Sequence, residues 1–305
     1  VGVLLGSLAY RAGYLRLIRW SGPLLLLMTV VLVLLFIPGI GQTINGARRW
    51  IVVFGLSFQP SESVKLLIPA YYVHWYLSQE KEVDFLSFVK IIALVSVPIA
   101  LILFEPDNGT TAIIVSTLIV LFFLTRIRWS YWALPLLVFV GLGGLVAYNT
   151  PYVHNRISVY LHPELDLKGK GHQPHQAKIA AGSGQLFGRG LGESLQKLNY
   201  LPEARNDYIA AIYAEETGFI GILALIGLYM LFAYMGFFVA MRAPDQAGFL
   251  LASILTFLIS IQAFLNLGIV SGLLPSKGMT LPFFSQGGSS LIANTVALFI
   301  LLDIA

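Results

Sequence analysis

Long apolar segments make up most of this sequence, and they constrain its fold more than any other feature. About nine segments approach or reach the roughly 20 residues that a helix needs to cross a bilayer. Hydrophobic residues make up 57% of the chain and charged residues only 11%, whereas a soluble domain carries about 25% charged residues. The sequence therefore predicts an all-α, polytopic membrane protein. The apolar segments are Val1–Tyr10, Trp20–Pro38, Ser63–Ser78, Phe88–Phe104, Gly109–Leu124, Trp132–Tyr148, Asp207–Met241, Ala247–Gly268 and Gly288–Ala305.

One long hydrophilic stretch interrupts this pattern. It covers residues 149–206, and its length indicates a functional loop rather than a connector. Because neither a soluble domain nor an internal repeat is visible, we expect one transmembrane domain over residues 1–305, with residues 149–206 as a large loop within it. The first apolar segment is a fragment and the last stops inside an apolar run, so both ends of the chain look trimmed.

Lysine and arginine are distributed unevenly between alternate short loops. By the positive-inside rule, the loops with the excess face the cytoplasm. The loops that hold only Arg48, Arg49 and Lys277, together with residues 149–206, are then expected outside. The net charge of +4 thus reports topology rather than nucleic-acid binding, and the three outer cations, which oppose the bias, point to a bound anion. The cytoplasmic cations are Arg11, Arg16, Arg19, Lys81, Lys90, Arg126, Arg128 and Arg242.

Each of the four segments that run inward from the outer face follows a short polar cluster. The clusters are residues 59–63, 105–109, 202–207 and 285–290. Helix N-termini expose unpaired N–H groups and partial positive charge, so these clusters and the three outer cations predict a polar outer cavity that binds an anion. The alternative for each cluster is ordinary capping and chain punctuation by Ser, Asp, Asn, Pro and Gly.

Several polar residues lie within or beside the apolar segments. Glu62 and Lys65 are neighbours on a helix face and form either a structural ion pair or part of a site. Glu215 and Glu216 either face the cavity or pair with a cation. Gln262 and Asn266 are four residues apart and could hydrogen-bond across helices.

Other motifs argue against common alternatives. The glycine-rich run 188–192 follows no strand, which disfavours a nucleotide loop, and its glycines instead indicate close backbone approach or mobility. The five histidines form no convincing metal site. Because the chain contains no cysteine, it has neither a disulfide nor a thiol nucleophile.

Taken together, the motifs resemble one family. The chain is similar to the SEDS proteins, the FtsW/RodA group of bacterial cell-wall polymerases, and looks more like FtsW, the division member, than RodA, the elongation member. It departs from the family at Arg205-Asn206, where His-Thr is usual before the aspartate, and at Glu105, where Gln is frequent. The matching strings follow the family's order and include Asn45–Ile51, Gln59–Glu62 with Lys65, Pro106–Asp107 with Gly109, Gly188–Gly192, Tyr200–Ala204, Glu215–Glu216, Leu274–Gly278 and Gly287–Ser290.

This resemblance implies a fold, a location and a reaction. The fold is a SEDS-type helical bundle with about nine spans here and ten in the family, so the first span and part of the second would be absent. The location is the cytoplasmic (inner) membrane, with the active site on the extracytoplasmic face. The reaction is peptidoglycan glycosyl transfer, in which lipid II is polymerised into glycan strands and undecaprenyl pyrophosphate is released. Such a reaction needs a general base and positive charge near the leaving group.

The resemblance also assigns roles to residues and partners. The family's essential aspartate matches Asp207, which is the expected base. A divalent cation, Mg²⁺ or Mn²⁺, could assist with the pyrophosphate, although the spacing shows no ligand set and we assign no metal ligand. The expected partners are lipid II, the bilayer and a class B penicillin-binding transpeptidase, with no nucleic acid. The expected substrate-binding residues are Arg48, Arg49, Glu62, Lys65, Asp107, Glu216, Lys277, Ser289 and Ser290.

Two other functions fit the same sequence features. A lipid II flippase would use the same cavity without chemistry, because transporters also place charged residues inside a helical bundle. A non-catalytic scaffold would only recruit the penicillin-binding protein. Glycan synthesis from purified lipid II distinguishes the enzyme from both.

Overall fold

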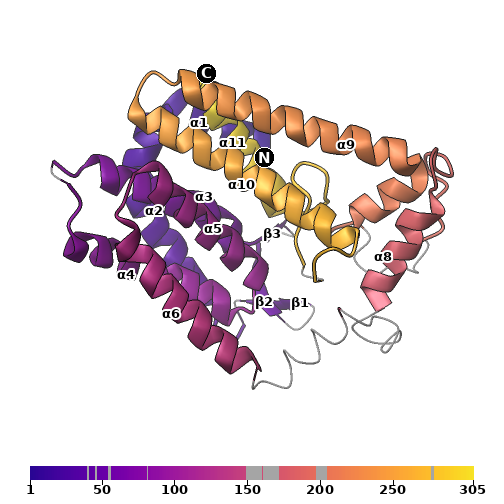
Figure 1. Ribbon diagram of the computed structural model, residues 1–305, viewed down its shortest axis with the longest axis horizontal. Helices are drawn as coiled ribbons and strands as arrows, with labels where there is room; N and C mark the ends of the chain where they lie inside the picture. The colour runs from indigo at the N-terminus through magenta and orange to yellow at the C-terminus, as the bar shows by residue number, and fades with distance from the viewer. Residues whose placement is uncertain are drawn as a thin grey trace. The chain divides into compact units, whose positions relative to one another are not determined.

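The computed structural model describes residues 1–39, 41–44, 47–53, 56–80, 82–148, 160, 172–196, 205–275 and 278–305, and the chain is mostly helical there (Figure 1). Lys277, residues 200–204 and most of the 149–206 loop lie outside these ranges. The helices are α1 (Gly2–Ala12), α2 (Tyr14–Leu35), α3 (Pro60–Leu77), α4 (Phe85–Phe104), α5 (Asn108–Leu124), α6 (Trp129–Tyr148), α8 (His172–Ser183), α9 (Ile209–Arg242), α10 (Gln246–Val270) and α11 (Gly288–Ile304).

Every predicted apolar segment coincides with one of these helices. By length and composition, α2, α4, α9 and α10 are long and apolar enough to cross a membrane, and α5 and α11 are shorter apolar helices. A multi-pass membrane protein follows from these helices, whereas the count of nine spans stays a prediction. Helix α8 falls inside the stretch that the sequence indicated only as a loop.

The all-α prediction misses a three-stranded antiparallel sheet between α2 and α3. Its strands are β1 (Gln42–Ile44), β2 (Ala47–Val53) and β3 (Leu56–Phe58), with β2 in the middle. Thr43 lies opposite Arg48 across one ladder, and Val52 lies opposite Ser57 across the other. The second half of β2 reads Trp-Ile-Val-Val, and aromatic and β-branched residues of this kind favour strands.

The chain divides into two compact units. Unit 1 comprises residues 1–127, 232–261 and 287–305, and unit 2 comprises residues 128–231 and 262–286. Within unit 1, α3 packs against α2, α4, α5 and α11, while α1 packs along α11. Ile68 and Tyr72 of α3 are fully buried, and the Tyr72 hydroxyl lies 3.0 Å from the Thr125 hydroxyl. Because helices surround α3, its polar residues are enclosed by protein.

Unit 2 contains a break in α9 at Gly218, which has φ 69° and ψ −166°. A break of this kind leaves backbone N–H and C=O groups without helical partners, and such groups are costly to leave unpaired within a protein. The segment 185–190, which follows α8, supplies the missing partners at 2.8–3.2 Å. The bonds run from the amides of Phe219 and Ile220 to the carbonyls of Gln185 and Leu186, and from the amides of Arg189 and Gly190 to the carbonyls of Glu215 and Glu216.

Two glycines make this pairing possible. Gly218 adopts a positive φ that side chains disfavour, and a Cβ at Gly188 would overlap the carbonyl oxygen of Glu216. Of the two roles that the sequence left open for the glycine-rich run, close backbone approach is the one that Gly188 serves.

Candidate functional site

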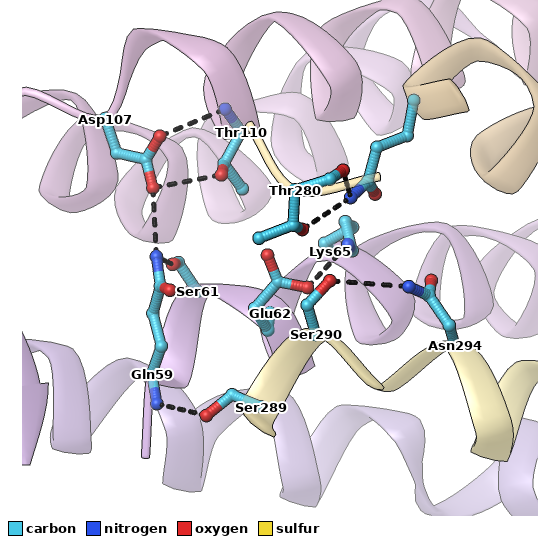
Figure 2. Close-up of polar contacts among 11 residues, drawn as sticks. Gln59, Ser61, Glu62, Lys65, Asp107, Thr110, Thr280, Ser289, Ser290 and Asn294 are labelled. Carbon is cyan, nitrogen blue, oxygen red and sulfur yellow. Dashed lines mark hydrogen bonds and ion pairs between the residues drawn. The ribbon is translucent and has the colours of Figure 1, made fainter. Parts of the chain in front are cut away.

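Three of the outward helix N-termini predicted from sequence meet at one end of unit 1. Gln59, which precedes α3, joins them (Figure 2). Its side-chain amide donates to the Ser61 hydroxyl at 3.0 Å and to Asp107 Oδ2 at 3.2 Å, and its backbone amide donates to Ser289 Oγ at 2.9 Å. The starts of α3, α5 and α11 are thus linked through one residue, and their partial positive charges add at this end.

Asp107 caps the start of α5. Its carboxylate accepts hydrogen bonds from the Thr110 amide at 3.1 Å and the Thr110 hydroxyl at 2.9 Å. Burial raises the pKa of this carboxyl, while nearby Arg49 and the Thr110 hydrogen bonds oppose that rise. The capping alternative therefore describes Asp107 well, because its carboxylate is already engaged by Thr110 and Gln59.

The two adjacent arginines have different surroundings. Arg49 donates through Nε to the Glu105 carbonyl at 2.9 Å and through Nη2 to the Pro106 carbonyl at 2.7 Å. A guanidinium at this position also complements the negative end of the α4 dipole. Arg48, the preceding residue on β2, is exposed. Of the two, Arg48 has the side chain that solvent reaches more readily.

Glu62 and Lys65 form a buried ion pair one turn into α3. Lys65 Nζ lies 2.6 Å from Glu62 Oε2, and the side chains are only 1% and 9% exposed, respectively (Figure 2). The predicted contact is therefore present. Burial of two charges costs several kcal/mol before their attraction is counted, so this pair is energetically expensive at a place where apolar residues would pack.

The two serines at the start of α11 are also buried and bonded. Ser289 Oγ accepts from the Gln59 amide and lies 3.2 Å from the Ser57 carbonyl, to which it donates. Ser290 Oγ accepts from the side-chain amide of Asn294 at 3.3 Å (Figure 2). The Ser289 hydroxyl thus helps to hold the N-terminus of α11 at the shared end of unit 1, whereas the bond between Ser290 and Asn294 lies within α11 itself.

Glu105 is a buried carboxyl that the sequence marked only as a departure from the family. It is 2% exposed, and neither carboxyl oxygen has a hydrogen-bond partner among the described residues. Burial raises its pKa from 4.5 to about 8; Asp107 adds to the rise and Arg49 opposes it. The fold therefore accommodates Glu105 as the neutral acid at neutral pH.

This raised pKa predicts a pH-dependent stability. Between about pH 4.5 and pH 8 the folded protein holds a proton that the unfolded chain has lost, so stability falls as pH rises through this window and levels off above it. Glu105→Gln should remove this fall and increase the free energy of unfolding at pH 8 by an amount of order a few kcal/mol. The melting temperature at pH 8 should rise accordingly. Exposed Glu80→Gln is the control. Parallel melting-temperature profiles of Glu105→Gln and the parent protein from pH 5 to 9 would contradict the prediction.

Asp207 lies in unit 2, in the turn that precedes α9, and is partly exposed. The side-chain amide of Asn266, on α10, donates to the Asp207 carbonyl at 2.9 Å and to the Met279 carbonyl at 2.6 Å. The hydroxyl of Ser285 donates to the Asn206 carbonyl at 2.6 Å. The segment that carries Asp207 is therefore fixed to α10 and to the segment before α11.

The two adjacent glutamates on α9 differ in role. Glu215 is 1% exposed, and its carboxylate accepts from the Ser194 hydroxyl at 2.6 Å and lies 3.6 Å from Arg189 Nε. Of the two predicted alternatives for Glu215, which were facing the cavity and pairing with a cation, the structure shows pairing with the cation Arg189. Glu216 is partly exposed, and its backbone carbonyl accepts from Gly190.

The sequence assigned no individual role to four residues that build these arrangements, of which only Thr110 lies outside its polar clusters: Gln59, Glu105, Thr110 and Ser285. Gln59 could have been found from its place directly before Pro60, where an N-cap residue stands. Asn266 was predicted to bond across helices, but its partners are carbonyls outside the helices. In the ranges that the structure describes, no group of three or more His, Asp or Glu residues could hold a metal ion.

Comparisons with known proteins place this architecture in a family. A family model described as cell cycle protein, which covers FtsW, RodA and SpoVE, matches residues 1–305. The chain is 40% identical over 310 residues to the probable peptidoglycan glycosyltransferase FtsW of Alcanivorax borkumensis, covering 99% of this chain and 80% of the relative. It is 38% identical over 312 residues to stage V sporulation protein E of Bacillus subtilis, covering 100% of this chain and 84% of the relative.

Solved structures agree with the sequence matches. A chain from a structure of polymerization and crosslinking by a peptidoglycan synthase complex superposes with a TM-score of 0.81 at 27% identity, covering 99% of this chain and 85% of that chain. The rod shape determining protein RodA of Thermus thermophilus superposes with a TM-score of 0.71 at 26% identity, covering 99% of this chain and 83% of that chain. The chain therefore belongs to the cell cycle protein family of FtsW, RodA and SpoVE.

Proposed function

We propose that this chain is a peptidoglycan glycosyltransferase that polymerises lipid II into glycan strands. The observation that carries the proposal is the 40% identity, over 99% of the chain, to a relative named as such an enzyme. The chemistry available at Asp207 and at the helix N-termini that Gln59 links supports it. A sugar hydroxyl of one lipid-linked unit attacks the anomeric carbon of the other, the bond to undecaprenyl pyrophosphate breaks, and the hydroxyl proton passes to a base.

The described side chains suggest how the work is divided. Asp207 takes the hydroxyl proton, because a carboxylate within reach of that proton can serve as general base. The N-termini of α3, α5 and α11, with Lys65 beneath them, provide positive charge for the pyrophosphate. Arg48 and Lys277 are further candidates for this anion. A divalent cation could assist with the pyrophosphate.

The apolar helices and the relatives support the following setting for the reaction. In this proposal the chain lies in the cytoplasmic membrane and the reaction takes place on its outer face. Its protein partner is a class B penicillin-binding transpeptidase. The match to a peptidoglycan synthase complex supports such a partner.

Glycan synthesis is the direct test of the function. The purified chain is incubated with lipid II, alone and with the transpeptidase partner, and the products are resolved on a gel. Glycan strands from the parent protein are expected. Transport of lipid II across vesicle membranes without polymer would favour a flippase, and neither activity would favour a scaffold.

The orientation makes a separate prediction. Because the chain has no cysteine, a single Lys170→Cys variant can report the side of the 149–206 loop. We expect this cysteine to react with an impermeant thiol reagent in intact spheroplasts, since the charge bias places the loop outside. Lys81→Cys, in a loop expected inside, should react only after lysis. The reverse pattern would invert the topology and remove the argument for an outer anion site.

A further inference from the structure

Three consecutive carbonyls lead up to the carboxyl group of Asp207, and each is held by a separate donor. The carbonyls belong to residues 205–207. Their donors are the Gln286 amide at 3.0 Å, the Ser285 hydroxyl at 2.6 Å and the Asn266 side-chain amide at 2.9 Å. A loop before a helix does not ordinarily need side chains from two other segments to fix it, so this arrangement restricts the Asp207 backbone unusually well.

The two side-chain donors are both buried. Asn266 is 1% exposed and Ser285 is 6% exposed. Asn266 Oδ1 has no hydrogen-bond partner among the described residues. An unpaired buried amide oxygen costs about 1–3 kcal/mol, and an apolar residue at this position of α10 would avoid that cost. The amide is thus retained for what its nitrogen does, which is to join Asp207 to Met279.

The same two side chains shape the segment that faces the Asp207 carboxyl. Asn266 also holds the Met279 carbonyl at 2.6 Å, and Ser285 Oγ also accepts from the Leu281 amide at 2.7 Å. Gly278 stands directly before Met279, and a Cβ there would lie only 3.0 Å from Asp207 Oδ2. The carboxyl group therefore lies against a backbone that Asn266 and Ser285 themselves hold in place.

We propose that Asn266 and Ser285 are positioning residues that hold the Asp207 carboxylate where it takes the sugar proton. The inference rests on the proposed function of Asp207 as the base. Fixing the backbone on one side and the facing segment on the other leaves the carboxylate little freedom besides its own side-chain torsions. A displacement of about 1 Å from a reactive geometry can lower a rate about 10²-fold, so losing either donor should affect the chemical step more than substrate binding.

The test compares Asn266→Ala and Ser285→Ala with a matched control, Tyr229→Phe. The Tyr229 hydroxyl donates to the Pro282 carbonyl at 2.6 Å, so the control removes a hydrogen bond to the same segment while the bonds to the carbonyls of residues 205–207 remain. Three quantities are measured with purified full-length protein: the rate of lipid II polymerisation as kcat and KM, the pH dependence of kcat/KM, and the melting temperature.

We expect kcat to fall about 10- to 100-fold in Asn266→Ala and Ser285→Ala, with KM for lipid II within about twofold of the parent. The acid limb of the kcat/KM profile, which reports the base in the free enzyme, should move in both variants. Tyr229→Phe should keep the parent's pH profile and a rate close to that of the parent.

Two results would overturn the inference. One is a fall in kcat no larger than that of Tyr229→Phe, and the other is a fall that follows the melting temperature while the pH profile stays fixed. Failure of the underlying function looks different: either the parent makes no glycan, or Asp207→Asn makes it normally. With an active parent and an inactive Asp207→Asn variant, each outcome for Asn266 and Ser285 decides the positioning role alone.

Discussion

Asp207→Asn is expected to make no detectable glycan strands from lipid II while remaining folded and inserted. The substitution keeps the size of the side chain and one carbonyl acceptor, but it removes the proposed general base. Loss of general-base assistance typically lowers a rate about 10²–10⁴-fold. Because the Asn266 and Ser285 contacts reach the backbone of residues 206–207 rather than the Asp207 side chain, they should survive the change.

Asp84→Asn provides the control for this variant. Asp84 also precedes a helix, since its carboxylate accepts from the Ser87 amide at 3.4 Å at the start of α4, and it is exposed. The Asp84→Asn variant makes the same chemical change at an N-cap residue that has no proposed catalytic role. Gel-resolved glycan, lipid II binding and melting temperature are measured for both variants beside the parent. Asp84→Asn should retain the parent's rate.

The outcomes for Asp207→Asn separate an enzyme from a flippase. An enzyme loses polymer and keeps lipid II binding. A flippase shows little change in transport, because no sugar hydroxyl has to lose a proton. Near-normal polymer from Asp207→Asn would show that another group is the base, even if the chain is a polymerase.

The helices could be predicted from sequence because each depends on a local property. An apolar run such as residues 88–104 must satisfy its backbone within a helix if it lies in lipid, and α4 begins only three residues earlier. The sheet was missed because its strands are short and part polar: Gln42–Ile44 gains its structure only by pairing with β2. The break at Gly218 was also hidden, since the segment that completes it lies about thirty residues earlier in the chain.

The site shows the same division between local and distant interactions. The Glu62–Lys65 pair was predictable because residues three apart meet on a helix. The bond from Gln59 to Asp107 was not, because its partners are 48 residues apart and come together only when α3 and α5 pack. The role of Asn266 was hidden for the same reason. It bonds a carbonyl 59 residues away, and sequence spacing alone does not reveal so distant a partner.

The buried Glu62–Lys65 pair yields the second large prediction. Lys65→Met should leave the Glu62 carboxylate buried without the Lys65 ammonium, and Glu62→Gln should remove the carboxylate that lies 2.6 Å from Lys65 Nζ. Breaking a buried ion pair at one partner typically costs about 3–5 kcal/mol of stability. With the two side chains 1% and 9% exposed and 2.6 Å apart, each single variant should therefore show a large fall in melting temperature.

The double variant Lys65→Met/Glu62→Gln separates stability from substrate binding. It removes both charges together, so no unpaired charge stays buried and the melting temperature should return close to that of the parent. If Lys65 serves the pyrophosphate, the stable double variant should still use lipid II poorly, with KM raised about tenfold or more, which is the worth of a hydrogen bond to a charged group.

A purely structural pair predicts a different pattern for the same three variants. Activity would then follow melting temperature, and the double variant would polymerise lipid II with the parent's KM. The comparison works because Glu62 and Lys65 lie one turn into α3, close to the helix N-termini that Gln59 links. An anion bound there would gain from the ammonium only if Lys65 can share its charge between Glu62 and the substrate. A parent-like KM in the stable double variant would therefore assign the pyrophosphate to the helix N-termini and the remaining cations, and leave Lys65 a structural role.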